Sequence, residues 1–89
     1  MLVKSSKNDL RIMLKKLDIK GKVCPMTFVY TKLTLEELNR GDILEVILDF
    51  PPAVKNIPKN CNRQNIAELI EKKELEPEEG IWLLKLKKL

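Results

Sequence analysis

The cysteine at position 24 is the residue in this chain that is best placed to do chemistry. It stands directly before Pro25 in the stretch KGKVCPMTFVYTKL, where the pattern predicts that a helix begins. Proline is favoured at the first helical position, so Cys24 is expected at or beside the N-cap. The free N–H groups and the positive dipole end of a helix favour a thiolate there over a thiol. The alternative is an inert cysteine, buried as a small hydrophobic side chain.

The residues around Cys24 favour the reactive interpretation. Lys20 and Lys22 add positive charge, and no acidic residue lies between Lys20 and Leu35. We therefore expect the pKa of the Cys24 thiol to be lowered, provided that the sulfur is not buried in apolar surroundings. The chain has no histidine, which excludes Ser-His-Asp and Cys-His catalysis and every imidazole metal site. A thiolate without a base, a metal or a second nearby cysteine is suited to carrying a group that one protein loads and another removes.

The second cysteine, Cys61, has a different setting. It lies in a polar stretch flanked by asparagines, where a second helix is predicted to end. Two cysteines so far apart, with no C-x-x-C pair, cannot form a structural zinc site within one chain. We interpret Cys61 as structural, and the alternatives are a resolving thiol or an incidental disulfide.

The predicted first helix carries two apolar stripes at helical spacing. One consists of Phe28, Thr31, Leu35 and Leu38, and the other of Met26, Val29, Tyr30 and Leu33. A single small sheet covers only one stripe well. Either both stripes are partly buried, or Met26, together with Tyr30, stays exposed near Cys24 as a docking surface.

Length and composition describe one ordinary folded domain, which we expect over residues 12–89. The chain has 89 residues, 44% hydrophobic and 34% charged, and no apolar run long enough to span a membrane. Its net charge of +4 favours an acidic protein partner or nucleic acid without identifying either. Residues 1–11 have neither the apolar middle nor the cleavage site of a signal peptide, and we expect them to form a flexible polar arm on a cytoplasmic protein.

The elements that must position Cys24 follow from the apolar periodicity and the turn residues. We expect strands over residues 12–19, 43–48, 66–74 and 81–89, and helices over residues 25–39 and from 51 or 52 to about 61. Pro58 is expected to kink the second helix or to be followed by an irregular turn, and residues 76–80 are expected to join the last two strands. The order β-α-β-α-β-β indicates an α/β (α+β) fold, a two-layer sandwich with two helices on one face of a mixed four-stranded sheet.

Cys24 and Pro25 at the start of a helix resemble the C-P-x-P signature of the TusA/SirA-like sulfur-carrier family. The chain is also similar to the family at several other positions, namely Asp18 to Gly21, Lys32, Gly41-Asp42, Asp49 with Pro51, and Ile57-Pro58. The resemblance covers about residues 12–88 and implies the same order of strands and helices. Thr27 stands where the signature has its second proline, so the chain resembles a divergent member of the family.

The resemblance implies that Cys24 accepts sulfane sulfur as a persulfide and that Pro25 holds the helix start. It implies two protein partners, a donor of the cysteine desulfurase or rhodanese type and a downstream acceptor, with no cofactor, metal or membrane. The residues expected to contact or steer these partners are Met26, Thr27, Lys20, Lys22 and Lys32. The destination of the sulfur is left open among tRNA thiolation, molybdenum cofactor assembly, sulfur oxidation and selenium handling.

Two other functions stay open beside this sulfurtransferase-type relay. A small basic sandwich of this order also resembles the C-terminal domain of translation initiation factor three, which would make the chain a nucleic-acid-binding module. Few aromatic residues for base stacking and a carboxylate-rich third strand argue against nucleic acid as a direct partner. The other alternative is a regulatory interaction module that has the same fold and no transfer activity.

Overall fold

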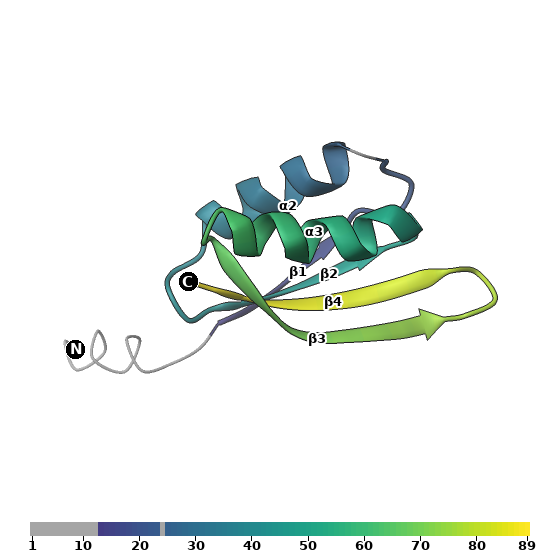
Figure 1. Cartoon of the computed structure of the whole chain (residues 1–89). Coiled ribbons are helices and arrows are strands. Elements are labelled where there is room, and N and C mark those ends of the chain that lie inside the picture. The colour runs from purple at the N-terminus through teal and green to yellow at the C-terminus, as the bar shows by residue number, and fades with distance from the viewer. Residues whose placement is uncertain (1–12, 24) are drawn as a thin grey trace.

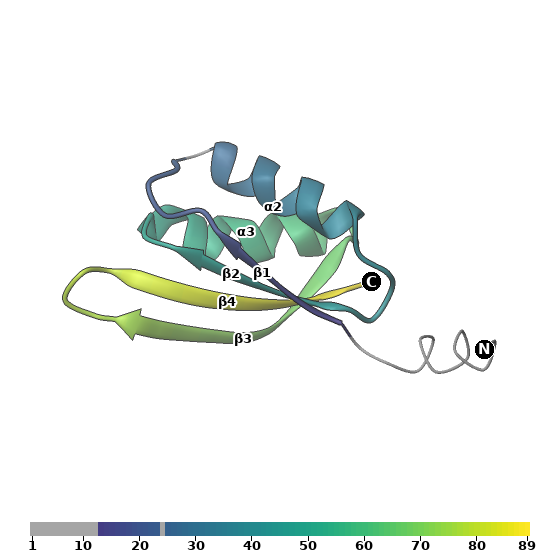
Figure 2. The same ribbon diagram turned by 180° about the vertical axis from the view of Figure 1, so that it is seen from behind.

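Figure 1 shows the computed structural model of the chain, which describes residues 13–23 and 25–89. Within these residues the elements are β1 (Leu14–Asp18), α2 (Met26–Glu36), β2 (Ile43–Leu48), α3 (Pro51–Arg63), β3 (Ala67–Glu76) and β4 (Ile81–Lys88). The strands form one sheet in the order β1-β2-β4-β3, with β1 parallel to β2 and the other neighbours antiparallel. Both helices lie on the same side of this sheet (Figures 1 and 2), so the predicted fold is confirmed.

The flexible arm predicted over residues 1–11 lies outside the described residues. Across the part of the chain that the structure does describe, neither helix is long and apolar enough to cross a membrane.

The core lies between the sheet and the two helices. Along β2 every second side chain is buried, and β4 pairs with it in register, as expected for strands with one covered face. The main buried apolar side chains are Leu44, Val46 and Leu48 of β2, Leu84 and Leu86 of β4, Leu35 of α2, and Ala53, Val54, Ile57 and Cys61 of α3. Burial of each large aliphatic side chain stabilises the fold by about 1.5–3 kcal/mol.

The helix α3 is longer and more regular than predicted. An irregular turn was expected after Pro58 and an end near Cys61, whereas the helix continues through both to Arg63. A proline inside a helix removes a backbone hydrogen bond and costs about 3 kcal/mol. This cost is offset by one face of the helix that is buried against the sheet, formed by Ala53, Val54, Ile57 and Cys61.

The strands β3 and β4 form a long hairpin joined by residues 77–80. The alternation of β4 is clear, because Leu84 and Leu86 are buried and Trp82 packs against the core, while Lys87 is exposed. Helix α3 covers only the start of β3, where Ala67 is buried and the rest of the strand is exposed. The turn of the hairpin extends beyond the ends of both helices (Figure 1).

The helix α2 ends at Glu36, before the predicted end at residue 39. The buried carboxylate of Asp42 accepts hydrogen bonds from the N–H of Asn39 at 2.8 Å and from the N–H of Met13 at 3.2 Å. At the helix end, Lys88 Nζ donates a hydrogen bond to the carbonyl of Leu35 at 2.8 Å. The same carbonyl accepts a hydrogen bond from the N–H of Leu38 at 3.0 Å, so the Lys88 ammonium adds a second donor and interacts favourably with the negative end of the helix dipole.

Candidate functional site

Two loops meet at the edge of the sheet where the parallel strands β1 and β2 end. The carboxyl ends of parallel strands lie at the same edge, so residues 19–23, which follow β1, lie beside Asp49, which follows β2. Ile19 extends the strand pairing, since its N–H donates a hydrogen bond to the carbonyl of Ile47 at 2.8 Å. The Oδ1 atom of Asp49 accepts a hydrogen bond from the N–H of Gly21 at 2.9 Å. The loop that leads into α2 is therefore attached to the end of the neighbouring strand.

A tight turn gives this loop its shape. The N–H of Lys22 donates a hydrogen bond to the carbonyl of Ile19 at 3.1 Å, and Gly21 has a φ of 88°. A positive φ at the third position of a four-residue turn is typical of a type II turn and is adopted without steric cost by glycine. Gly21 is thus required by the turn that reverses the chain before α2.

Cys24 lies outside the described residues, but the residues on both sides of it are described. Pro25 is the N-cap of α2, with φ −92° and ψ 3°, and the helix begins at Met26. Pro25 was expected one position further inside the helix, and the difference leaves Cys24 directly before the cap. The cap makes no side-chain hydrogen bond and the first turn of α2 contains no acidic residue. The positive dipole end of α2 is therefore not neutralised by a carboxylate in that turn.

The three lysines singled out from the sequence have different surroundings. Lys20 Nζ lies 3.2 Å from Asp18 Oδ2, and the N–H of Lys20 donates to Asp18 Oδ1 at 3.0 Å. This backbone hydrogen bond, with the side chain of Lys20, lowers the pKa of Asp18. Lys22 Nζ lies 5.4 Å from the centre of the Tyr30 ring, in a cation–π contact. Lys32 is a partly buried residue about two turns into α2, so Lys22 is the lysine that stays at the helix start.

One face of α2 exposes apolar side chains to solvent. This face, which we call the α2 stripe, consists of Met26, Val29, Tyr30 and Leu33, with exposed fractions of 37–53%. The exposure of Met26 and Tyr30 that the sequence left open is therefore confirmed, and their role as a docking surface stays a prediction. Contiguous exposed apolar side chains are typical of a surface that binds another protein.

Thr27 lies on the opposite face of α2. It is fully buried, and its carbonyl accepts a hydrogen bond from Thr31 Oγ1 at 2.8 Å. Thr27 was expected among the partner-binding residues, but a buried side chain offers a partner no surface. The residue that replaces the second proline of the signature therefore takes part in packing α2 against the sheet.

Cys61 has the properties of a structural cysteine. It lies inside α3, which continues to Arg63 and does not end near Cys61 as expected, and its side chain is completely buried. Burial raises the pKa of its thiol to about 11, because a thiolate is poorly solvated in apolar surroundings. At neutral pH Cys61 is a thiol without access to solvent, and it is unsuited to nucleophilic attack.

Asp49 holds the loop through Gly21, and the sequence did not identify it as a site residue. It was noted as part of the family resemblance and not as a site residue. The available signal was an acidic residue directly after a strand that is parallel to the strand leading to Cys24. Polar side chains at the carboxyl ends of parallel strands often serve a site at that edge.

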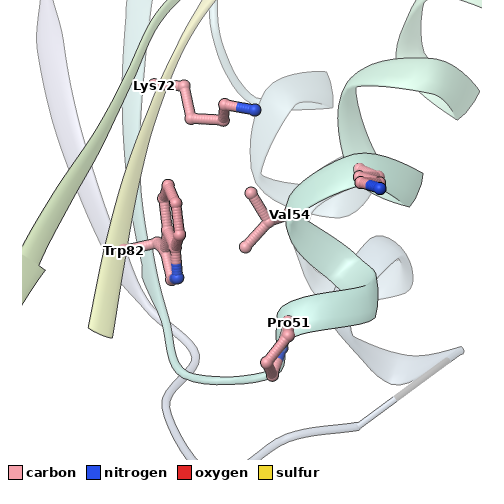
Figure 3. A pocket seen from close by; sticks show the side chains of 5 residues that line it. Pro51, Val54, Lys72 and Trp82 are labelled. Atoms are coloured by element: carbon pink, nitrogen blue, oxygen red, sulfur yellow. The ribbon is translucent and has the colours of Figure 1, made fainter. Parts of the chain in front are cut away.

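A small cavity lies on the other side of α3, between its first turn and the hairpin (Figure 3). Its volume is about 190 Å³, and its lining residues are Pro51, Val54, Lys55, Lys72 and Trp82. Lys72 Nζ lies 5.9 Å from the centre of the Trp82 ring, and Val54 faces that ring across the cavity. The cavity is smaller than typical cofactor sites, and the described residues contain no group of three potential metal ligands.

Comparison with known proteins gives a family match over most of the chain. Residues 15–88 match the family model described as sulfurtransferase TusA. A curated relative from Archaeoglobus fulgidus is 44% identical over 72 residues, which cover 81% of this chain and 78% of the relative. A relative from Thermotoga maritima is 37% identical over 73 residues, which cover 82% of this chain and 91% of the relative. Both relatives carry the name "Putative sulfur carrier protein".

A solved structure shares the fold. The crystal structure of a SirA-like protein from Desulfitobacterium hafniense aligns with a TM-score of 0.64 over 82% of this chain and 95% of that chain. The two sequences are 23% identical, so this likeness concerns the fold alone.

Proposed function

Because the chain belongs to the TusA family of sulfurtransferases, we propose that it is a sulfur carrier that holds sulfane sulfur as a persulfide on Cys24. The observation that carries the proposal is the start of α2. Pro25 caps the helix with no acidic residue in the first turn, and the α2 stripe is exposed beside it. A cysteine directly before such a cap favours the thiolate, which is the nucleophilic form.

The proposed cycle consists of two thiolate attacks on a persulfide. The Cys24 thiolate attacks the terminal sulfur of the donor's persulfide, a new S–S bond forms on Cys24, and the donor cysteine leaves as a thiolate. A thiolate of the acceptor protein then attacks the terminal sulfur on Cys24 and releases the Cys24 thiolate. Each step breaks one S–S bond and forms another, so the sulfur moves without an external oxidant or reductant.

The neighbouring residues support this cycle in different ways. Lys22, held over the Tyr30 ring, places a positive charge near the start of α2 that favours the anionic forms of the thiol and the persulfide. Asp49 and Gly21 hold the preceding loop against the end of β2. The charge of Lys22 also steers an acidic partner toward this end of the molecule, whereas Lys20 is paired with Asp18 and Lys32 lies about two turns along α2.

The partners are a donor of the cysteine desulfurase or rhodanese type and an acceptor protein, and both dock on the α2 stripe. Met26, at the start of the stripe, lies two positions after Cys24 and is 40% exposed. An apolar contact there brings the partner's reactive sulfur to Cys24 without any cavity on this chain. We place the relay in the cytoplasm, where free thiols are kept reduced.

Intact-mass measurement tests the proposal. The protein is incubated with a cysteine desulfurase and cysteine, or with a rhodanese and thiosulfate, and its mass is recorded without reductant. The wild type and Cys61→Ser are expected to gain one sulfur atom, and Cys24→Ser none. A wild type that neither donor modifies, or a sulfur that persists in Cys24→Ser, contradicts the proposal.

A further inference from the structure

The side of the sheet that faces away from the helices carries an ordered pattern of charges. Its central row runs across the four strands through Lys16, Glu45, Lys85 and Glu71, which pair in register. The charges alternate in sign, and Lys85 Nζ lies 3.6 Å from Glu45 Oε2 and 3.3 Å from Glu71 Oε1. These ion pairs raise the pKa of Lys85, with the hydrogen bond to Glu71 as the largest cause.

The next row along the strands has charges only at its ends. It runs through Asp18, Ile47, Leu83 and Lys73. Asp18 and Lys73 lie on the two edge strands, and the partly exposed Ile47 and Leu83 form an apolar pair between them on β2 and β4. No described segment covers these two rows, because both helices lie on the opposite side of the sheet (Figures 1 and 2).

We propose that this open sheet face binds the same face of a second copy of the chain, about a two-fold axis that is parallel to the strands and lies between β2 and β4. Such an axis places β1 opposite the partner's β3 and β2 opposite the partner's β4. In the central row Lys16 then faces the partner's Glu71. In the next row Asp18 faces the partner's Lys73, and Ile47 faces the partner's Leu83. The charge pattern is therefore complementary to itself in this orientation.

The other two-fold arrangement of two stacked sheets is disfavoured by the same residues. An axis in the plane of the interface and perpendicular to the strands places each strand opposite its own copy. Lys16, Glu45 and Lys85 of the central row would then each face an identical charge, which costs free energy. Sheets that pack face to face lie about 10 Å apart with strand directions within about 30° of each other, so the strand-parallel axis fits the usual geometry.

A third row lies on the other side of the central row from Asp18 and Lys73, and it is also compatible with this axis. It runs through Leu14, Ile43, Lys87 and Glu68. Leu14 comes to lie near the partner's Glu68, and Ile43 near the aliphatic stem of the partner's Lys87. No like charges meet in this row, so the complementarity of the other two rows decides the orientation.

The proposed dimer leaves the helical sides of both copies free. A rotation about an axis parallel to the strands keeps the strand direction, so the carboxyl ends of β1 and β2 point the same way in both copies. The two loops of residues 19–23 then lie at one end of the dimer, with both α2 stripes facing outward. The inference concerns assembly and does not depend on the proposed sulfur transfer.

Charge reversal at Lys16 and Glu71 tests this inference. Sedimentation equilibrium of the full chain at about 100 μM, with a reductant present, is expected to give a dimer. Lys16→Glu alone and Glu71→Lys alone are each expected to weaken dimerisation about tenfold, because each places like charges across the interface twice per dimer. An equimolar mixture of the two variants is expected to form a heterodimer, since both cross-interface contacts again join opposite charges.

The mixture of the two variants reports on contacts between chains and not on contacts within one chain. Lys16 and Glu71 lie on opposite edge strands, three strand spacings or about 14 Å apart, so they cannot pair within one chain. Lys59→Glu, which makes the same charge change at an exposed position of α3, is the matched control and is expected to dimerise like the wild type. A monomeric wild type, a mixture that does not recover, or equal weakening by Lys59→Glu would overturn the inference.

Discussion

The Oδ1 atom of Asp49 accepts a hydrogen bond from the backbone N–H of Gly21 at 2.9 Å, between residues 28 positions apart in the chain. This bond joins the loops that follow the two parallel strands, and Gly21 lies three positions before Cys24. A hydrogen bond from a backbone N–H to a carboxylate is stronger than one to a neutral acceptor. The position of the loop before Cys24 therefore depends on a side chain from the end of β2.

Replacing Asp49 is expected to slow sulfur loading and to have only a small effect on the free energy of unfolding. Asp49→Ala removes the acceptor for the Gly21 N–H, so the loop before Cys24 loosens and the loading rate falls about tenfold. The bond is exposed, and we expect the free energy of unfolding to fall by no more than about 1 kcal/mol. Asp49→Asn keeps an oxygen acceptor and is the matched control. Loading of Asp49→Ala at the wild-type rate would show that the bond does not position the loop.

The α2 stripe is expected to govern the affinity for the sulfur donor. Leu33 is 53% exposed, so Leu33→Ser should change the free energy of unfolding by about 0.5 kcal/mol or less. It should raise KM for the donor protein about tenfold, with kcat unchanged, because it removes an apolar contact made in the bound state. Ile70→Ser on β3 is the control, since Ile70 is 46% exposed and lies away from α2. The same KM for both variants would argue against docking on the stripe.

Because the thiol of Cys61 is buried, we expect the free energy of unfolding to decrease in alkaline solution. Its pKa is raised from 9.0 to about 11 in the folded protein, so between these pH values the thiol ionises in the unfolded chain and not in the folded one. The free energy of unfolding should therefore fall by roughly 2 kcal/mol as pH rises from about 9 to about 11, and this contribution should not change below pH 9.

Urea denaturation of Cys61→Ala isolates this contribution. Other groups that titrate in the same range are shared by the variant and the wild type, so the difference between the two pH profiles belongs to Cys61. The variant starts from a lower stability because it lacks a buried sulfur atom, and its profile should be flatter by about 2 kcal/mol. Parallel profiles would show that the burial of Cys61 does not perturb its ionisation.

The contact between Lys88 and the end of α2 is expected to contribute to stability. Lys88→Met keeps most of the aliphatic stem and removes the hydrogen bond to the Leu35 carbonyl, which should cost about 1 kcal/mol. Lys87→Met, at the exposed neighbouring position, should cost less than half as much. Chemical denaturation of the two variants measures the difference, and equal losses would mean that the helix end gains nothing from Lys88.

The fold could be predicted because its signals are local. The alternation of β4, the short apolar run of β2 and Pro25 before α2 each indicate one element without reference to distant residues. The continuation of α3 through Pro58 could not be predicted in this way. It depends on how much of the helix is buried against the sheet, and this burial is a property of the assembled fold.

The site was predicted less completely, because its contacts are made by residues that are distant in the chain or that have competing partners. The bond between Asp49 and Gly21 depends on the parallel pairing of β1 and β2. Lys20 was grouped with Lys22 by sequence position, but its ammonium is paired with Asp18. Which apolar stripe of α2 is buried could not be decided from the sequence, because both stripes have helical spacing and similar composition.

A sulfur carrier must be able to pass on the sulfur held by Cys24, and this ability is measured by transfer to a second protein. The chain is loaded with labelled sulfur by a desulfurase, separated from it, and mixed with fresh, unloaded desulfurase that has received no cysteine, so that the desulfurase thiol serves as the acceptor. This chain is expected to lose the mass of one sulfur atom, and the desulfurase is expected to gain the label without added reductant. Label that stays on the chain, or leaves it only when a reductant is added, would show that Cys24 does not hold transferable sulfur.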